Sequence, residues 1–196
     1  MGRQGRRQTG RGLKTAVTAQ PIVSVVIATH NRPEPVRRLL EAVAAQDLTQ
    51  IEAIVVDDGS QAEAWAAVQA AVAALGPRFR AVRNEIPQGP SAARNRGVQL
   101  ASGRFVAFCD DDDLWTRDDH LSSAVAVLEA SGLDLFFGEM LKVGPDNAPA
   151  GLWFAPRLDL SGAVRLDGGD DLHRLTESHL AGFLGHRILH ANTLVI

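Results

Sequence analysis

Short apolar runs and longer segments with helical spacing alternate along most of the chain. The runs are three to seven residues long and rich in β-branched side chains, as expected for strands of a sheet that is covered on both faces. The expected strands are Ile22–Ala28, Ile51–Val56, Arg80–Val82, Phe105–Phe108 and Leu133–Phe137.

Helices are expected between these strands. From Pro35 to Ala45, apolar side chains recur three and four positions apart, and the proline suits the first turn of a helix. Further helices are expected at Ala62–Leu75, Ser91–Ala101 and Arg117–Ala130. Because strand and helix alternate repeatedly, we predict an α/β fold with a mostly parallel sheet, sandwiched by helices and joined by right-handed crossovers.

The pattern changes beyond residue 138. A turn at Gly144–Asn147 separates two short expected strands, and Asp170–Leu184 has the spacing of an amphipathic helix. The end, Ile188–Ile196, has the pattern of a strand. Since C-termini rarely lie inside a buried strand, we expect an incomplete domain. The expected regions are a basic tail (1–20), an α/β body (21–138) and a partial second region (139–196).

Composition and charge exclude several classes of protein. In these 196 residues the apolar stretches are too short for a membrane-spanning helix, and the single cysteine, Cys109, excludes a disulfide framework. It suits a core position in a reducing compartment. Residues 1–20 carry five basic and no acidic side chains, whereas the remainder has 15 basic against 23 acidic residues, a net charge of −8. Nucleic acid is therefore not an expected partner of the body. The tail is expected to be disordered, either solvated or weakly attracted to anionic lipid headgroups.

Polar loops follow three of the expected strands. The first strand leads into Thr29–Arg32, the second into Asp57–Ser60 and the fourth into Asp110–Asp113. In open α/β sheets, ligands bind outside the carboxyl ends of the strands, where such loops converge. Two of the three loops are rich in carboxylates, so the sequence predicts a polar site at this edge.

Four consecutive aspartates, Asp110–Asp113, are the strongest chemical signal in the chain. Two carboxylates about 5 Å apart repel by roughly 3 kcal/mol at an effective dielectric near 20, so the group favours a bound cation. Oxygen ligands indicate Mg²⁺ or Mn²⁺. In an extended segment, Asp110 and Asp112 would share one ion while Asp111 faces away. The alternative is an acidic turn that caps the next helix, a role also open to the aspartates at 118 and 119.

Other loops suggest contacts to a nucleotide. The Asp58 carboxylate could accept a hydrogen bond from the imide N–H of a base such as uracil, although Asp-Gly-Ser is also a common turn. The Thr29–Arg32 loop could supply backbone groups to a base or ribose. Gly89 precedes a helix whose first N–H groups could hold phosphate, and Arg94 adds a charge suited to a diphosphate. The alternative there is a surface arginine beside a capping Ser91.

Five segments carry these features in a characteristic order and spacing: Val23–Arg32, Val55–Ser60, Ala93–Gly97, Ala101–Gly103 and Phe108–Trp115. Together they resemble the family 2 glycosyltransferases of the GT-A fold. The resemblance implies transfer of a sugar from a nucleotide diphosphate donor, commonly a UDP-sugar, to an acceptor, with inversion at the anomeric carbon. It covers residues 22–115 and continues through the helix to residue 130.

The resemblance also implies roles for individual residues. Asp58 matches the aspartate that binds the base, and Asp110 with Asp112 match an Asp-x-Asp motif whose second aspartate binds the metal and diphosphate. Asp113 lies in the same loop. The expected nucleotide-binding residues are Ala28, Thr29, Asn31, Asp57, Asp58, Arg94 and Asp111. The expected ligands of Mg²⁺ or Mn²⁺ are Asp110, Asp112 and Asp113.

Partners and location follow from the same resemblance. The general base that takes the acceptor proton is expected beyond Ile196, because Thr193–Ile196 resembles the strand that precedes it, and 139–196 would be part of the acceptor side. The acceptor would be a saccharide, lipid-linked or protein molecule. Such an enzyme would build cell-envelope polysaccharide in the cytoplasm, with peripheral association at the inner face of the membrane as a further expectation.

Other functions would need different sequence features. A sugar nucleotidyltransferase has a Gly-Gly-x-Gly-Thr-Arg loop after its first strand, where this chain has Ala28–Pro33. A dinucleotide-dependent dehydrogenase needs Gly-x-Gly-x-x-Gly at the same turn. A non-catalytic module that binds nucleotide sugars stays open, because no general base is assigned.

Overall fold

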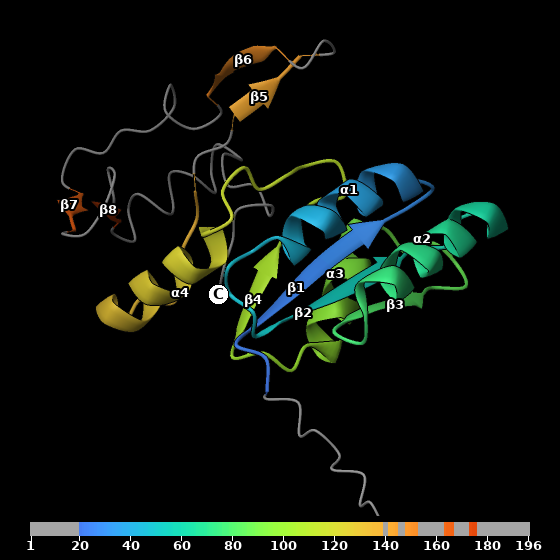
Figure 1. Cartoon of the computed structure of the whole chain (residues 1–196), viewed down its shortest axis with the longest axis horizontal. Helices are drawn as coiled ribbons and strands as arrows, with labels where there is room; N and C mark the ends of the chain where they lie inside the picture. Colours follow the sequence, from blue (N-terminus) through green and yellow to red (C-terminus); the bar gives the residue numbers. More distant parts are fainter. Residues whose placement is uncertain (1–19, 139–140, 145–147, 153–162, 167–172, 176–196) are drawn as a thin grey trace, which may run out of the picture.

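A computed structural model describes residues 20–138, 141–144, 148–152, 163–166 and 173–175 (Figure 1). The body consists of β1 (Val23–Thr29), α1 (Pro33–Ala44), β2 (Ile51–Asp57), α2 (Ala62–Leu75), β3 (Phe79–Arg83), α3 (Pro90–Leu100), β4 (Phe105–Phe108) and α4 (His120–Ser131). Four short strands follow: β5 (Leu141–Val143), β6 (Pro149–Leu152), β7 (Val164–Arg165) and β8 (His173–Arg174). No helix in this part of the chain is long and apolar enough to cross a lipid bilayer.

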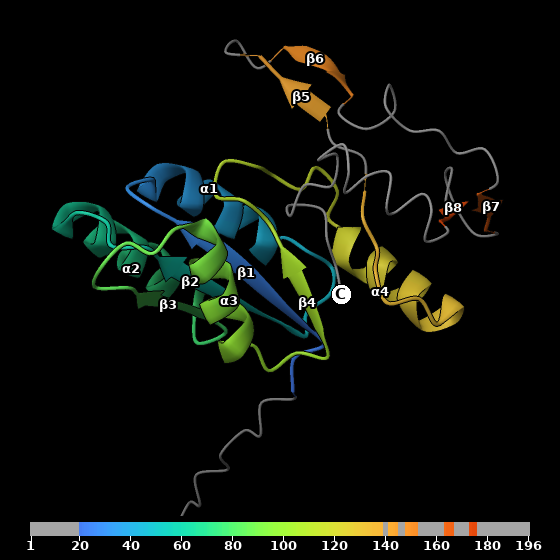
Figure 2. The same ribbon diagram turned by 180° about the vertical axis from the view of Figure 1, so that it is seen from behind.

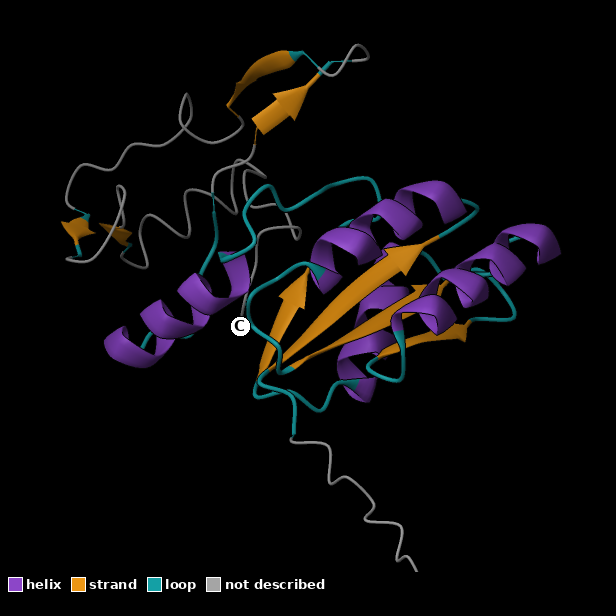
Figure 3. Ribbon diagram, in the orientation of Figure 1, coloured by secondary structure: helices purple, strands orange, loops and turns teal. Residues whose placement is uncertain are grey.

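Four parallel strands form the central sheet in the order β3-β2-β1-β4 (Figure 3). Val23 of β1 aligns with Ile51 of β2 on one side and with Phe105 of β4 on the other. Ala53 of β2 aligns with Phe79 of β3. Each connection between these strands contains a helix, as parallel pairing requires. The predicted parallel α/β architecture is confirmed, and the carboxyl ends of all four strands lie at one edge.

Helices cover both faces of the sheet. α1 and α2 lie in front of it in Figure 1, whereas α3 lies on the other face, which Figure 2 views from behind. Val25 and Ile27 of β1 belong to the larger core, which also contains apolar residues of α1, α2 and α4. A smaller core on the α3 side contains Ile54, Val56 and Ala93. Burial on both faces explains why the central strands are apolar along almost their whole length.

Gly97 lets α3 approach the sheet closely. A Cβ atom built at this position would lie 2.3 Å from Cγ1 of Val26, a distance that real Cβ contacts do not reach. Since α3 packs across β1 and β2, the missing side chain sets the separation of the helix from the sheet. The close packing brings the first turn of α3 next to the carboxyl ends of the strands.

Two secondary-structure predictions are wrong. Leu133–Phe137 contains only an isolated bridge residue, because Leu133 and Phe136 pack their side chains on the main core instead of extending the sheet. His173–Arg174, expected within the Asp170–Leu184 helix, pairs antiparallel with β7 as a strand. The hairpin of β5 and β6 confirms the two strands expected around the Gly144 turn. The remainder of Asp170–Leu184 and the strand expected at Ile188–Ile196 lie outside the described residues.

Candidate functional site

A cavity of about 930 Å³ opens at the carboxyl edge of β1, β2 and β4. Loops after all three strands line it, together with the first turn of α3 and with β5, so the predicted convergence of these loops is present. The predicted site residues that line the cavity are Ala28, Thr29, Asp58, Arg94, Asp110, Asp111, Asp112 and Asp113. Asn31 and Asp57 are not among its lining residues.

Asp57 and Asp58 serve opposite faces of the sheet, because side chains alternate along a strand. Asp57 is fully buried, and its Oδ1 accepts a 3.0 Å hydrogen bond from the backbone N–H of Ser60. Nε of Arg83 lies 3.6 Å from the same oxygen, and the guanidinium of Arg83 stacks over the ring of Trp65 in α2. Asp57 therefore anchors the turn after β2. Its contact with a nucleotide stays a prediction.

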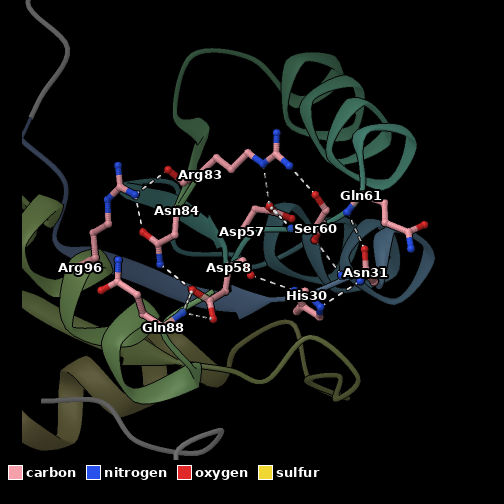
Figure 4. A network of polar contacts seen from close by, with 10 residues as sticks. All are labelled: His30, Asn31, Asp57, Asp58, Ser60, Gln61, Arg83, Asn84, Gln88 and Arg96. Carbon is pink, nitrogen blue, oxygen red and sulfur yellow. Dashed lines mark hydrogen bonds and ion pairs between the residues drawn. The ribbon is translucent and has the colours of Figure 1, made fainter. Parts of the chain in front are cut away.

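Asp58 holds the segment that leads into α3 (Figure 4). Its Oδ1 accepts hydrogen bonds from the side-chain amide of Asn84 at 2.7 Å and from the backbone N–H of Gln88 at 2.9 Å. Its Oδ2 accepts from the N–H groups of Gln88 and Gly89 at 3.0 and 2.7 Å. Burial alone would raise the pKa of Asp58, but these donors outweigh it, and the pKa lies below its usual value. The carboxylate is ionised beside the cavity, and its contact with a base stays a prediction.

The loop after β1 is bonded to the other two polar loops. Thr29 Oγ1 donates a 2.6 Å hydrogen bond to Oδ2 of Asp111, which joins β1 to the aspartate run. His30 Nδ1 lies 2.8 Å from the carbonyl oxygen of Asp58. Since a carbonyl oxygen only accepts, Nδ1 carries the proton and donates it. This bond orients the His30 ring, which lines the cavity.

Asn31 connects the loop after β1 with the start of α2 (Figure 4). Its backbone has a φ of 57°, a left-handed conformation that asparagine tolerates better than most residues. Its N–H donates to Oγ of Ser60 and its side-chain oxygen accepts from the N–H of Gln61, both at 2.7 Å. Asn31 therefore fixes the relative position of two loops, and direct contact with a donor stays a prediction.

The aspartate loop, Asp110–Asp113, is a turn closed by a 3.1 Å hydrogen bond from the N–H of Asp113 to the carbonyl oxygen of Asp110. The expectation of an extended segment with alternating side chains is therefore wrong. Cys109, just before the turn, is buried in the main core as predicted, and burial raises the pKa of its thiol.

Two arginines contact three of the four aspartates. Arg94 of α3 pairs with Asp110, and Nη1 of Arg32 lies 3.1 Å from Oδ1 of Asp111 and 2.5 Å from Oδ2 of Asp112. Burial raises the pKa of Asp111, although the hydrogen bond from Thr29 and the charge of Arg32 oppose that effect. Within the described residues, no group of three or more Asp, Glu, His or Cys side chains is arranged to hold a metal ion.

The first turn of α3 faces the same cavity. Gly89, with a φ of 90°, is its N-cap, Pro90 follows at the first helical position, and no side chain caps the helix. Ser91 is therefore not the capping residue that the alternative interpretation required. The N–H of Gly89 already donates to Asp58 and Pro90 has none, so Ser91 and Ala92 supply the N–H groups that lack partners within a first helical turn. Arg94 lies one turn further on. These are the groups from which an anion site was predicted.

Three residues that the sequence did not single out belong to this arrangement. Arg32 and His30 line the cavity, and Asn84 contacts Asp58 beside it. A signal for Asn84 was available, because it directly follows the carboxyl end of β3. The two others stand in the first loop, where an isolated histidine or arginine is usually solvated.

Comparison with known proteins decides the family. The family model for glycosyl transferase family 2 matches residues 24–163, which include the α/β body from the second residue of β1 onward and all of the cavity-lining residues named above. The chain belongs to glycosyl transferase family 2.

Curated relatives of this family 2 chain include a protein named for succinoglycan biosynthesis and a glucosyltransferase. It is 35% identical over 174 residues to the succinoglycan biosynthesis protein ExoO of Rhizobium meliloti, covering 89% of this chain and 45% of ExoO. It is 26% identical over 136 residues to WfgD of Escherichia coli, a UDP-Glc:α-D-GlcNAc-diphosphoundecaprenol β-1,3-glucosyltransferase, covering 69% of this chain and 52% of WfgD. The chain thus spans about half the length of these relatives.

Solved structures of glycosyltransferases show the same GT-A fold. A mannosyltransferase of Pyrobaculum calidifontis, in complex with GDP-Man and Mn²⁺, matches 65% of this chain and 37% of its own with a TM-score of 0.56 and 26% identity. TarS of S. aureus in complex with UDP matches 67% of this chain and 39% of its own with a TM-score of 0.57 and 27% identity. The predicted GT-A architecture is therefore confirmed.

Proposed function

We propose that this chain binds a UDP-sugar in the cavity at the carboxyl edge of its sheet and transfers the sugar to a saccharide, lipid-linked or protein acceptor with inversion. The observation that carries the proposal is the joint presence, around one cavity, of Asp58, Arg94 and the aspartate loop in a family 2 chain. The curated relatives named for UDP-Glc transfer, and the UDP complex of TarS, favour UDP as the nucleotide.

We assign a base end and a phosphate end to this cavity. Asp58 is ionised and lies beside the cavity, so it would attract the imide N–H of uracil. Arg94 and the open first turn of α3 would attract the diphosphate. Ala28 and Thr29 lie between these groups at the end of β1 and would face the nucleoside.

The aspartate loop fits a divalent metal that is held jointly by protein and substrate. Mg²⁺ and Mn²⁺ take oxygen ligands and are commonly bound by only one or two carboxylates together with substrate phosphates. The described residues contain no metal-binding group of three or more such side chains, which suits binding by one or two carboxylates together with phosphate. The side chain of Asp112 is 55% exposed beside the cavity. Asp112, together with Asp110 or Asp113 of the same turn, would hold the ion, which would stabilise negative charge on the departing diphosphate.

The chain's own residues would then prepare a single displacement. Arg94 would hold the diphosphate in place. The bond between the diphosphate oxygen and the anomeric carbon could then break as the acceptor oxygen bonds to that carbon. The acceptor hydroxyl proton passes to a general base, to which we assign no residue. β5 lines the cavity through Leu141, Lys142 and Val143, so we assign 139–196 to the acceptor side.

Calorimetry on the full chain tests this function. UDP, GDP and UDP-glucose would be titrated with and without Mn²⁺ into the wild type, Asp112→Ala and the control Asp118→Ala, an exposed aspartate that does not line the cavity. We expect Mn²⁺-dependent binding of UDP that is lost only in Asp112→Ala. The absence of UDP binding to the wild type in the presence of Mn²⁺ would contradict the proposal.

A further inference from the structure

A single nitrogen of Arg32 bridges two carboxylates of the aspartate loop. Nη1 lies 3.1 Å from Oδ1 of Asp111 and 2.5 Å from Oδ2 of Asp112. It therefore occupies a position between two carboxylate oxygens that a shared cation would take. Arg32 is also the N-cap residue of α1 and lines the cavity, so its charge belongs to the site although it is not part of the aspartate loop.

The three groups differ in how firmly the protein holds them. The side chain of Asp111 is 8% exposed and has a second partner besides Arg32, the 2.6 Å hydrogen bond from Thr29. The side chains of Arg32 and Asp112 are 53% and 55% exposed, so both can change partner without leaving a buried charge. The contact between Arg32 and Asp112 is therefore the part of this cluster that can open at low cost.

We propose that Arg32 is an internal cation that competes with the divalent metal for Asp112, and that this competition makes the metal and the nucleotide diphosphate bind cooperatively. The inference rests on the proposed function. A metal that binds alone must displace Arg32 and leave its guanidinium without that carboxylate. When the diphosphate is present in the same cavity, the released guanidinium gains a new anion, so the displacement costs less.

Linkage makes this coupling reciprocal. If the diphosphate raises the affinity of the chain for metal by some factor, the metal raises the affinity for the diphosphate by the same factor. With Arg32 bound to it, the aspartate loop would thus bind a metal weakly in the absence of the donor and more tightly once the donor is present. Arg94 is less suited to such displacement by a metal, because its side chain is only 25% exposed and it pairs with Asp110 from within α3.

Mn²⁺ binding measured directly tests the inference. The free Mn²⁺ signal in electron paramagnetic resonance would be followed in titrations of the full chain, with and without UDP. The variants are Arg32→Gln, which removes the cation, and Arg32→Lys, which keeps the charge but lacks the planar fork. The matched control is Arg37→Gln, an exposed arginine of α1 that pairs with Glu34 and Glu41 away from the cavity.

The expected result is tighter Mn²⁺ binding by Arg32→Gln in the absence of UDP, by about tenfold, within the range typical of coupled sites. The tightening of Mn²⁺ binding by UDP should shrink by a similar factor, Arg32→Lys should fall between, and Arg37→Gln should match the wild type. Unchanged or weaker Mn²⁺ binding by Arg32→Gln without UDP would overturn the inference while leaving the proposed function intact, provided that the wild type binds Mn²⁺ and UDP together. A wild type that binds neither would overturn both.

Discussion

The side-chain amide of Asn84 donates a 2.7 Å hydrogen bond to the buried carboxylate of Asp58, and this bond joins the ends of β3 and β2 beside the cavity. Asn84 is only 4% exposed, and its own side-chain oxygen accepts a hydrogen bond from Arg96 of α3. The amide thus connects three elements of the sheet and helix layers (Figure 4). Asp58 owes both its orientation and its lowered pKa partly to this donor.

Replacement of Asn84 by alanine should weaken both stability and nucleotide binding. Asp58 would lose one of its donors and Arg96 one of its acceptors, so we expect a loss of about 1–3 kcal/mol in the free energy of unfolding, measured in urea. The affinity for UDP should fall because Asp58 is less well fixed. Gln88→Ala is the matched control, because Gln88 bonds to Asp58 through its backbone N–H, which alanine keeps. Equal behaviour of the two variants would contradict this role.

Arg94 should distinguish the diphosphate from the nucleoside. In Arg94→Gln the charge near the first turn of α3 is lost, so we expect the affinity for UDP to fall about tenfold or more, the scale of a hydrogen bond to a charged group. The affinity for uridine should change little, because the substitution leaves Asp58, at the proposed base end of the cavity, untouched. Calorimetry with both ligands checks this. A parallel loss of uridine binding would instead indicate a general disturbance of the site.

The sequence predicts the body of the fold well because the pattern of apolar and polar residues in each segment agrees with the helix or strand that the segment forms around the parallel sheet. β4 and α2 were predicted with their observed bounds, since polar residues or glycine lie within two residues of each end of the apolar pattern. The failure at Leu133–Phe137 has a physical cause: apolar residues there satisfy the core through side-chain packing, which periodicity does not distinguish from strand pairing. His173–Arg174 fails for the opposite reason, because pairing with β7 overrides a helical spacing.

The candidate site was predictable to the extent that it follows from topology. The carboxyl ends of parallel strands must meet, so the meeting of Thr29, Asp58 and the aspartate loop needed no side-chain detail. The contacts among them were not predictable, because the turn at Asp110–Asp113 and the reach of Arg32 depend on tertiary packing. Asp57 and Asp58 are adjacent in one sequence motif. Only the alternation of side chains along the strand indicates that Asp57 is the buried anchor and that Asp58 lines the cavity.

Gly97→Ala should destabilise the fold. The added methyl group would lie 2.3 Å from Cγ1 of Val26, so either this side chain or α3 must shift. Overpacking of this kind costs about 1–3 kcal/mol, which exceeds the gain in helix propensity of somewhat less than 1 kcal/mol. Urea unfolding checks the sign, with Gln99→Ala as the control at an exposed position of the same helix. Stabilisation by Gly97→Ala would show that the helix can retreat from the sheet without loss.

His120 should make the fold sensitive to mild acid. The centroid of its ring lies 4.9 Å from that of Trp115 and 6.1 Å from that of Phe136. Burial lowers the pKa of His120 from 6.5 to about 4. The unfolded chain therefore binds a proton between these pH values that the folded chain does not, so stability falls as the pH drops from 6.5 towards 4. From pH 7 to pH 5 the contribution of this group is a loss of about 2 kcal/mol.

The variant His120→Phe isolates that contribution, since it keeps an aromatic ring between Trp115 and Phe136 and removes the titrating group. The nearby charges of Asp119 and Arg117 are unchanged in it. Urea unfolding of both proteins at pH 7 and pH 5 gives two losses of stability, and the loss should be smaller in His120→Phe by about 2 kcal/mol. Carboxylates elsewhere titrate alike in both proteins and cancel in this difference. Equal losses would mean that protonated His120 is accommodated in the folded state, and that the cluster of Trp115, His120 and Phe136 admits water.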